Sequence, residues 1–117
     1  MKIDDILKKD SIIADLVGTN KGEVLREITD FLQSQGLIKD KEALLDTLIE
    51  REKLGSTGIG ENVAIPHGKS AELSQIVTVF ARSLNGVDFE ALDQKPVHFV
   101  CMVIAPSNST GQHLKAL

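Results

Sequence analysis

The sequence predicts an α/β (α+β) fold, a three-layer sandwich in which helices flank a mixed β-sheet. Two amphipathic helical patterns follow one another between residues 20 and 54, and two nearly continuous apolar runs occupy residues 76–84 and 97–105. Such runs are typical of inner strands that are covered on both faces. With 117 residues, the chain is long enough for one hydrophobic core and too short for two domains.

The first predicted elements are a strand and a helix. Residues 11–17 form a short, apolar, β-branched segment, which favours a strand. A helix is predicted to begin after Asn20, because the Asn20 side chain can accept a hydrogen bond from the backbone amide of Glu23. Gly36 is expected to end this helix. Its predicted buried face consists of apolar residues at helical spacing: Val24, Leu25, Ile28, Phe31 and Leu32.

A second helix is predicted over residues 41–54, with Asp40 as its cap and Gly55 at its end. Its predicted buried face consists of Leu44, Leu45, Leu48 and Ile49. On a helical wheel, Arg51 falls at the border of this face, where an arginine can point its guanidinium into a neighbouring cleft. A solvated Arg51 that pairs with Glu50 or Glu52 is the simpler alternative, and the pattern leaves it open.

Most strands of the sheet are predicted in the second half of the chain. A brief strand is expected at residues 63–65, and long strands at 76–84 and 97–105. Asn85-Gly86 indicates a turn, and a polar connection follows it. A last helix is expected to begin at Gly111.

The composition argues against several classes of protein. Thirteen Lys and Arg against seventeen Asp and Glu give a formal net charge of -4, and the chain has four Phe but no Tyr or Trp. Nucleic-acid binding is therefore not expected, because it needs basic stripes or stacking platforms. The N-terminus lacks the apolar region of a signal peptide, and no apolar run approaches the ~20 residues that cross a bilayer. A cytoplasmic protein without membrane insertion is expected.

The residues outside the glycine-rich region offer little chemistry. Cys101 is the single cysteine, so it cannot form an intrachain disulfide. His98 and Cys101 lie three apart on a predicted strand, hence on opposite faces, and cannot share a metal ion. We therefore expect His98 to be a core or half-buried histidine with a hydrogen-bond partner and Cys101 to be a packing residue, and we predict no metal site. Solvation is the ordinary explanation for Asp88, Glu90 and Asp93 in the polar connection, and no role is assigned to them.

The glycine-rich segment and the histidine after it form the most specific pattern. Residues 55–60 (GSTGIG) contain three glycines, and adjacent amides in such a loop can bind an anion, although a simple turn is the commoner explanation. His67 follows Pro66, which stiffens the chain, and precedes Gly68, which removes side-chain bulk. The spacing alone leaves open whether His67 is functional or an ordinary surface histidine.

With GSTGIGENVAIPHGK and the preceding Arg51-Glu52 in view, the sequence resembles the IIA component of the fructose/mannitol class of the bacterial phosphoenolpyruvate-dependent phosphotransferase system. That class includes the nitrogen-regulatory IIA proteins. The likeness runs from the N-terminal strand through GVDFEALDQKPVHFVCMVIAP to the closing GQHLKAL. Residues 1–117 therefore resemble a single domain of this class that ends before the family's C-terminal helical part.

The resemblance implies a phosphotransferase component with a phosphohistidine intermediate. His67 would accept a phosphoryl group from the phosphocarrier protein HPr or its nitrogen-branch relative. It would then pass the group to a IIB component, or signal to regulatory target proteins through its phosphorylation state. Arg51 matches the family's active-site arginine, and His113 matches its second histidine.

The chemistry of phosphoryl transfer agrees with this implication. A neutral imidazole has a nitrogen lone pair that can attack phosphorus, and the transferred group needs charge compensation. Arg51 and His113 could supply donors, and amides around Thr57 and Gly58 the remaining hydrogen bonds. No metal or organic cofactor is needed. Two alternatives stay open: an interaction module that keeps the IIA fold without phosphotransfer, and an unrelated small hydrolase or metalloenzyme.

Overall fold

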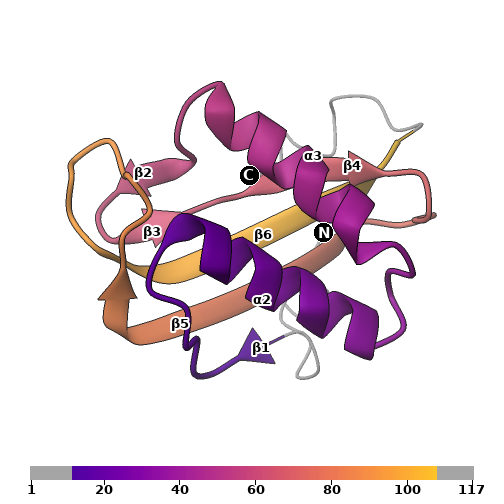
Figure 1. Ribbon diagram of the computed structural model, residues 1–117, viewed down its shortest axis with the longest axis horizontal. Helices are drawn as coiled ribbons and strands as arrows, with labels where there is room; N and C mark the ends of the chain where they lie inside the picture. The colour runs from indigo at the N-terminus through magenta and orange to yellow at the C-terminus, as the bar shows by residue number, and fades with distance from the viewer. Residues whose placement is uncertain (1–11, 108–117) are drawn as a thin grey trace.

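The computed structural model describes residues 12–107, which form a mixed sheet with two helices on one of its faces (Figure 1). The strands are β1 (Ile12–Ile13), β2 (Gly58–Gly60), β3 (Val63–Ala64), β4 (His67–Ser70), β5 (Val77–Val87) and β6 (Val97–Pro106). The helices are α2 (Lys21–Ser34) and α3 (Lys41–Lys53). The strand order is β1-β5-β6-β3-β2, and β4 also pairs with β6. The predicted mixed α/β fold is confirmed, whereas the helix expected from Gly111 lies outside the described residues.

Local sequence signals set both ends of α2. The Asn20 side chain accepts a hydrogen bond of 2.9 Å from the amide of Glu23, as predicted. Gly36 has a φ of +75° and follows the helix as expected. The amide of Leu37 then donates to the carbonyl of Leu32 at 3.0 Å, which satisfies a carbonyl of the last turn. The buried side chains of this helix are Val24, Leu25, Ile28, Thr29 and Leu32.

Removing the cap of α2 should destabilise the protein measurably. Asn20→Ala is expected to lower the free energy of unfolding by about 1 kcal/mol, because the Glu23 amide loses its partner. Asn20→Ser keeps an acceptor and should cost only a few tenths of that amount. Urea-induced unfolding of both variants measures the difference, and equal losses would show that the side-chain bond does not stabilise the helix.

Helix α3 also begins where the sequence predicts. The Asp40 side chain accepts a hydrogen bond of 3.1 Å from the amide of Ala43. Leu44, Leu45 and Leu48 are buried, and Ile49 is partly buried against the same core. Glu52 is buried as well, which the sequence analysis did not anticipate.

The predicted turn at Asn85-Gly86 is wrong. Strand β5 continues to Val87, and its pairing with β6 changes register between Arg82 and Val87. Gly86 has a φ of +90°, and a Cβ there would lie 2.9 Å from the Pro96 side chain. An Asn-Gly pair suits any position that needs a left-handed residue, and here that position is an irregularity within the strand.

Strands β3 and β4 lie along the same side of β6, and both run parallel to it. The strand expected at 63–65 is confirmed as Val63–Ala64. Ile65 and Pro66 separate it from β4, whose first residue, His67, lies opposite Val103. The pairing with a central strand therefore holds His67 firmly at one end of the sheet.

The face of the sheet away from the helices is partly apolar. Ile12, Phe80 and Cys101 share this face through the strand pairing, and Phe99 on the same face is 55% exposed. These residues line a groove of about 430 Å³. Within residues 12–107, helices cover the other face alone (Figure 1). Neither described helix is long and apolar enough to cross a membrane.

Candidate functional site

His67 is half-buried at the start of β4, and both of its ring nitrogens have partners. Nδ1 lies 2.9 Å from the carbonyl oxygen of Ile65, and Nε2 lies 3.3 Å from Nε of Arg51. A carbonyl oxygen can only accept, so Nδ1 carries the ring proton. In this neutral tautomer, the lone pair is on Nε2 and faces the guanidinium.

Arg51 reaches the ring from the last turn of α3. Its Nε donates to Nε2 of His67, and its Nη1 donates to the carbonyl of Gly55 at 2.9 Å. The alternative pairing with Glu50 or Glu52 does not form. Glu50 accepts from Lys53 at 2.9 Å, and Glu52 lies 3.2 Å from the ammonium of Lys21. The guanidinium is therefore positioned for the His67 ring and not for the acidic residues beside it in sequence.

The amides of Thr57 and Gly58 are already used within the protein. The Thr57 amide donates to Glu52 Oε1 at 3.0 Å, and the Gly58 amide donates to the Ser56 hydroxyl at 3.0 Å. The segment also forms strand β2 from Gly58 onward and not an open loop. A phosphate-binding role for these two amides would require both hydrogen bonds to break, so the expected anion-binding concavity is not open at either position.

Glu52 is the residue near the site that sequence reasoning missed. Its carboxylate accepts two hydrogen bonds from Thr57 and pairs with Lys21. Helical spacing could have found it, because Glu52 follows Leu45 and Leu48 at i+7 and i+4, in the middle of the buried face. Its charge favoured a solvated position instead. His113, the second predicted histidine, lies outside the described residues.

His98 and Cys101 have structural surroundings. Nδ1 of His98 lies 2.8 Å from the carbonyl oxygen of Ser83, as expected for a half-buried histidine with a partner. Among residues 12–107, no group of three or more His, Cys, Asp or Glu side chains could hold a metal ion. Burial raises the pKa of the Cys101 thiol above its ordinary value.

The Cys101 thiol is consequently expected to react slowly in the native protein. A raised pKa means that a smaller fraction is thiolate at pH 8, and the thiolate is the nucleophile. Alkylation by iodoacetamide, followed by intact mass, should therefore be several-fold slower in the folded protein than in urea. Equal rates in the two states would contradict the burial of this thiol.

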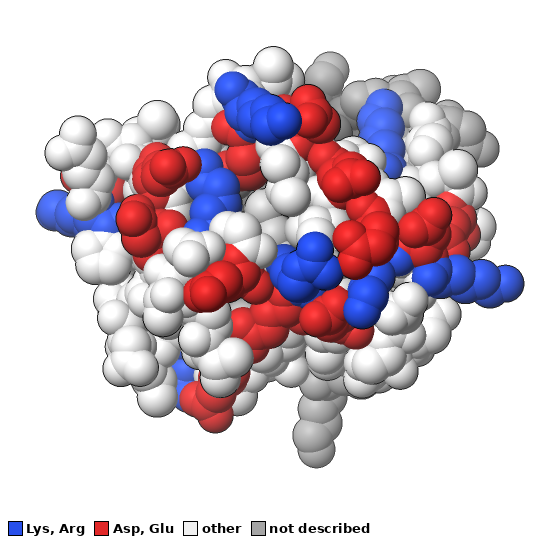
Figure 2. All heavy atoms as spheres, in the orientation of Figure 1, with Lys and Arg blue, Asp and Glu red and all other residues white. Residues whose placement is uncertain are grey.

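Charges on the helix-covered face are mixed. Figure 2 shows Lys and Arg interspersed with Asp and Glu on this face, without a continuous basic stripe. Several are paired, as in Arg26–Glu42 and Lys41–Asp30, both at 2.9 Å. This face therefore lacks the basic surface that nucleic-acid binding requires.

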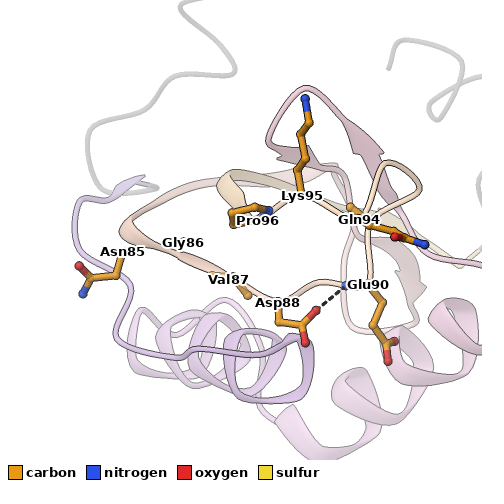
Figure 3. Close-up of a pocket in the computed structure, with 9 residues that line it drawn as sticks. Asn85, Gly86, Val87, Asp88, Glu90, Gln94, Lys95 and Pro96 are labelled. Carbon is orange, nitrogen blue, oxygen red and sulfur yellow. Dashed lines mark hydrogen bonds between the residues drawn. The ribbon is translucent and has the colours of Figure 1, made fainter.

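A cavity of about 480 Å³ lies where the end of β5 meets its connection to β6, lined by residues between Asn85 and Pro96. The backbone amide of Glu90 donates to Asp88 at 3.2 Å, and the Glu90 and Lys95 side chains point in opposite directions (Figure 3). Asp93 accepts hydrogen bonds from the amides of Glu61 and Lys95. Asp88 and Asp93 therefore accept backbone hydrogen bonds within the loop, whereas the Glu90 carboxylate pairs with Lys21 of α2.

Comparisons with known proteins identify the family of this chain. Residues 5–117 match the family described as "Phosphoenolpyruvate-dependent sugar phosphotransferase system, EIIA 2". The chain is 38% identical to the fructose-specific EIIABC component of Bacillus subtilis over 117 residues, all of this chain and 18% of that protein. The chain thus spans less than a fifth of that relative's length.

Solved structures show the same fold. The nitrogen regulatory protein IIA-Ntr of Neisseria meningitidis superposes with a TM-score of 0.85 at 36% identity, over 97% of this chain and 77% of that one. A complex of Escherichia coli IIA mannitol with phosphorylated IIB mannitol superposes with a TM-score of 0.73 at 24% identity, over 94% of this chain and 75% of that one. The match over nearly the whole chain and the shared fold lead to one conclusion: the chain belongs to the EIIA 2 family of the phosphoenolpyruvate-dependent sugar phosphotransferase system.

Proposed function

We propose that His67 carries the phosphoryl group, on Nε2. It would accept the group from phosphorylated HPr or from the nitrogen-branch HPr. The observation that carries this proposal is the pair of hydrogen bonds on the ring. The Ile65 carbonyl holds the proton on Nδ1, which leaves Nε2 as the nucleophile, and Nε2 lies beside a guanidinium that can compensate the charge of a phosphoryl group.

The transfer step exchanges one bond to phosphorus for another. The Nε2 lone pair attacks phosphorus as the bond between phosphorus and the donor breaks, and that electron pair leaves with the donor. The ring proton stays on Nδ1, which donates to the Ile65 carbonyl throughout. In-line transfer needs the ring in one fixed orientation, which this hydrogen bond and the start of β4 provide.

Arg51 would exchange partners during the step. Its Nε now donates to the nitrogen that becomes phosphorylated. Once Nε2 is bonded to phosphorus, the guanidinium can donate instead to a phosphoryl oxygen, while Nη1 stays tethered to the Gly55 carbonyl. The group that keeps the nucleophile in place thereby becomes the group that stabilises the product.

The receiver of the phosphoryl group is proposed to be a IIB component, or a regulatory target that senses the phosphorylation state. The first possibility rests on the likeness to the IIA mannitol chain that was solved with phosphorylated IIB mannitol. The second rests on the likeness to IIA-Ntr. Loss of the phosphoryl group on addition of a purified fructose-type IIB protein would support the transport branch.

The proposal is tested by phosphorylation of the wild-type protein. Incubation with each phosphorylated HPr should add one phosphoryl group to the intact mass, labile in acid and stable in base. Coupling between ¹⁵N and ³¹P should then place phosphorus on Nε2 of His67. Absence of the added mass with both donors would favour a non-catalytic interaction module, and a label on Nδ1 would contradict the proposed geometry.

A further inference from the structure

The Glu52 carboxylate is a buried acidic group that the proposed transfer step does not use. It follows Arg51 directly on α3, and its side chain is 4% exposed. A carboxylate is rarely buried to this extent unless it is paired and hydrogen-bonded. The partners of the Glu52 carboxylate therefore indicate its structural role.

Those partners satisfy the carboxylate on both oxygens. Oε1 accepts from the Thr57 amide at 3.0 Å and lies 3.2 Å from Nζ of Lys21, while Oε2 accepts from the Thr57 hydroxyl at 2.5 Å. Lys21 is itself 15% exposed and also pairs with the exposed Glu90. Because Lys21 is the first residue of α2, the carboxylate joins the start of α2, the end of α3 and the segment that leads into β2.

Hydrogen bonds connect this carboxylate to the histidine by way of the backbone of Thr57 and Ile65. The Thr57 carbonyl accepts from the Ile65 amide at 3.0 Å. The Ile65 carbonyl in turn is the partner of Nδ1 of His67 at 2.9 Å. The orientation of the Ile65 carbonyl, and with it the position of the ring proton, therefore depends on where Glu52 holds Thr57.

Arg51 depends on the same anchor. Its Nη1 is bonded to the Gly55 carbonyl, which lies between α3 and Thr57 in the chain. The clamp between Glu52 and Thr57 closes this short connection. Both members of the histidine–arginine pair are thus positioned relative to one buried carboxylate.

We propose that Glu52 is a positioning residue. By clamping Thr57, it keeps the Ile65 carbonyl directed at Nδ1 of His67, so that the neutral ring presents Nε2 to the phosphoryl donor. The expected effect of Glu52 on the rate of phosphoryl uptake rests on the proposed function, whereas its expected effect on the His67 tautomer does not. Thr57 accordingly acts through its bonds to Glu52. The effect resembles that of outer groups that set the tautomer of a metal-bound histidine.

The test compares Thr57→Val with Thr57→Ser. Valine removes the hydroxyl that donates to Glu52 while matching the shape of threonine, and serine retains the hydroxyl. In the unphosphorylated protein, ¹⁵N chemical shifts of the His67 ring measure the two neutral tautomers. Thr57→Val is expected to lower the fraction protonated on Nδ1 and to slow phosphoryl uptake about tenfold, whereas Thr57→Ser should resemble wild type in both.

Two further variants separate positioning from stability. Gly36→Ala adds a side chain to a residue with a φ of +75°, beyond the end of α2 that is remote from Lys21. It weakens the fold without altering a residue of this hydrogen-bonded connection, so its ring shifts and uptake rate should match wild type. Should Thr57→Val fail to fold, Glu52→Gln provides the second measurement. In Glu52→Gln, an NH2 group takes the place of Oε2 and can only donate to the Thr57 hydroxyl, whereas Oε2 accepts from it. The variant also lacks the negative charge that pairs with Lys21. The fraction of His67 rings protonated on Nδ1 should therefore fall again.

A folded Thr57→Val or Glu52→Gln protein with wild-type ring shifts and a wild-type uptake rate would overturn the inference. A tautomer shift equal to that of Gly36→Ala would do the same, because it would trace to general destabilisation. Absence of phosphoryl uptake by the wild-type protein would instead contradict the proposed function. The ring shifts in the unphosphorylated protein would still decide whether Glu52 positions His67.

Discussion

A His67→Ala variant is expected to take up no phosphoryl group from phosphorylated HPr. The substitution removes Nε2, the ring nitrogen that has a lone pair and lies 3.3 Å from the Arg51 guanidinium. Among the described residues, the other histidine is His98, whose ring bonds to the Ser83 carbonyl and to no Lys or Arg side chain. Intact mass measured over a time course should show one added phosphoryl group on the wild-type protein and none on the variant.

His98→Asn is the matched control for this experiment. His98 is also half-buried, and its Nδ1 also faces a backbone carbonyl, but it lies near the start of β6, whereas His67 pairs with Val103 further along that strand. Its variant should therefore be labelled to the wild-type extent, provided that circular dichroism shows a folded protein. Labelling of His67→Ala to the same extent as wild type would assign the phosphorylated residue elsewhere and remove the basis of the proposed mechanism.

Arg51→Ala is expected to slow phosphoryl uptake by roughly ten- to a hundredfold. The variant lacks the donors that would compensate the charge of the moving group, and a charged hydrogen bond of this kind contributes about 1.5–3 kcal/mol. The uptake rate of Arg51→Lys should lie between those of wild type and Arg51→Ala. Lysine keeps the positive charge but lacks the planar guanidinium that contacts both His67 and Gly55. Rapid-quench measurement at equal donor concentrations gives the three rates.

Lys53→Ala tests whether position, and not charge alone, matters. Lys53 lies in the same last turn of α3, is exposed, and pairs with Glu50. Its variant loses the same unit of charge without losing a contact to the ring, so uptake should stay near the wild-type rate. If Arg51→Ala transfers at the wild-type rate, Arg51 has no part in the step. If Lys53→Ala is equally slow, the effect is a general electrostatic one.

Local signals account for what the sequence predicts well. The caps at Asn20 and Asp40 and the end of α2 at Gly36 are confirmed, because each depends on hydrogen bonds or a backbone angle within a few residues. The turn predicted at Asn85-Gly86 is wrong because it also relied on a local signal, and here the local signal was not sufficient. The dipeptide specifies a left-handed residue, whereas the pairing of β5 with β6 decides that this residue lies inside a strand.

The candidate site likewise combines features that local sequence predicts with features that depend on distant residues. From the residues alone one can see that His67 follows a stiff Ile-Pro step and that Arg51 lies at the border of a predicted buried helix face. It did not reveal that Glu52, in the middle of that face, would bind Thr57 and Lys21. A charged residue on a buried stripe can be recognised as buried only when its partners are known, and Lys21 is 31 residues away along the chain.

Tertiary structure alone decided which nitrogen of His67 is available. The ring proton lies on Nδ1 because the Ile65 carbonyl faces it, and the Arg51 guanidinium lies on the other side because α3 packs across the start of β4. Sequence periodicity establishes which face of a helix is buried, since that follows from residue spacing. It leaves undetermined the direction of a hydrogen bond between two elements, since that direction depends on how the elements are placed in space.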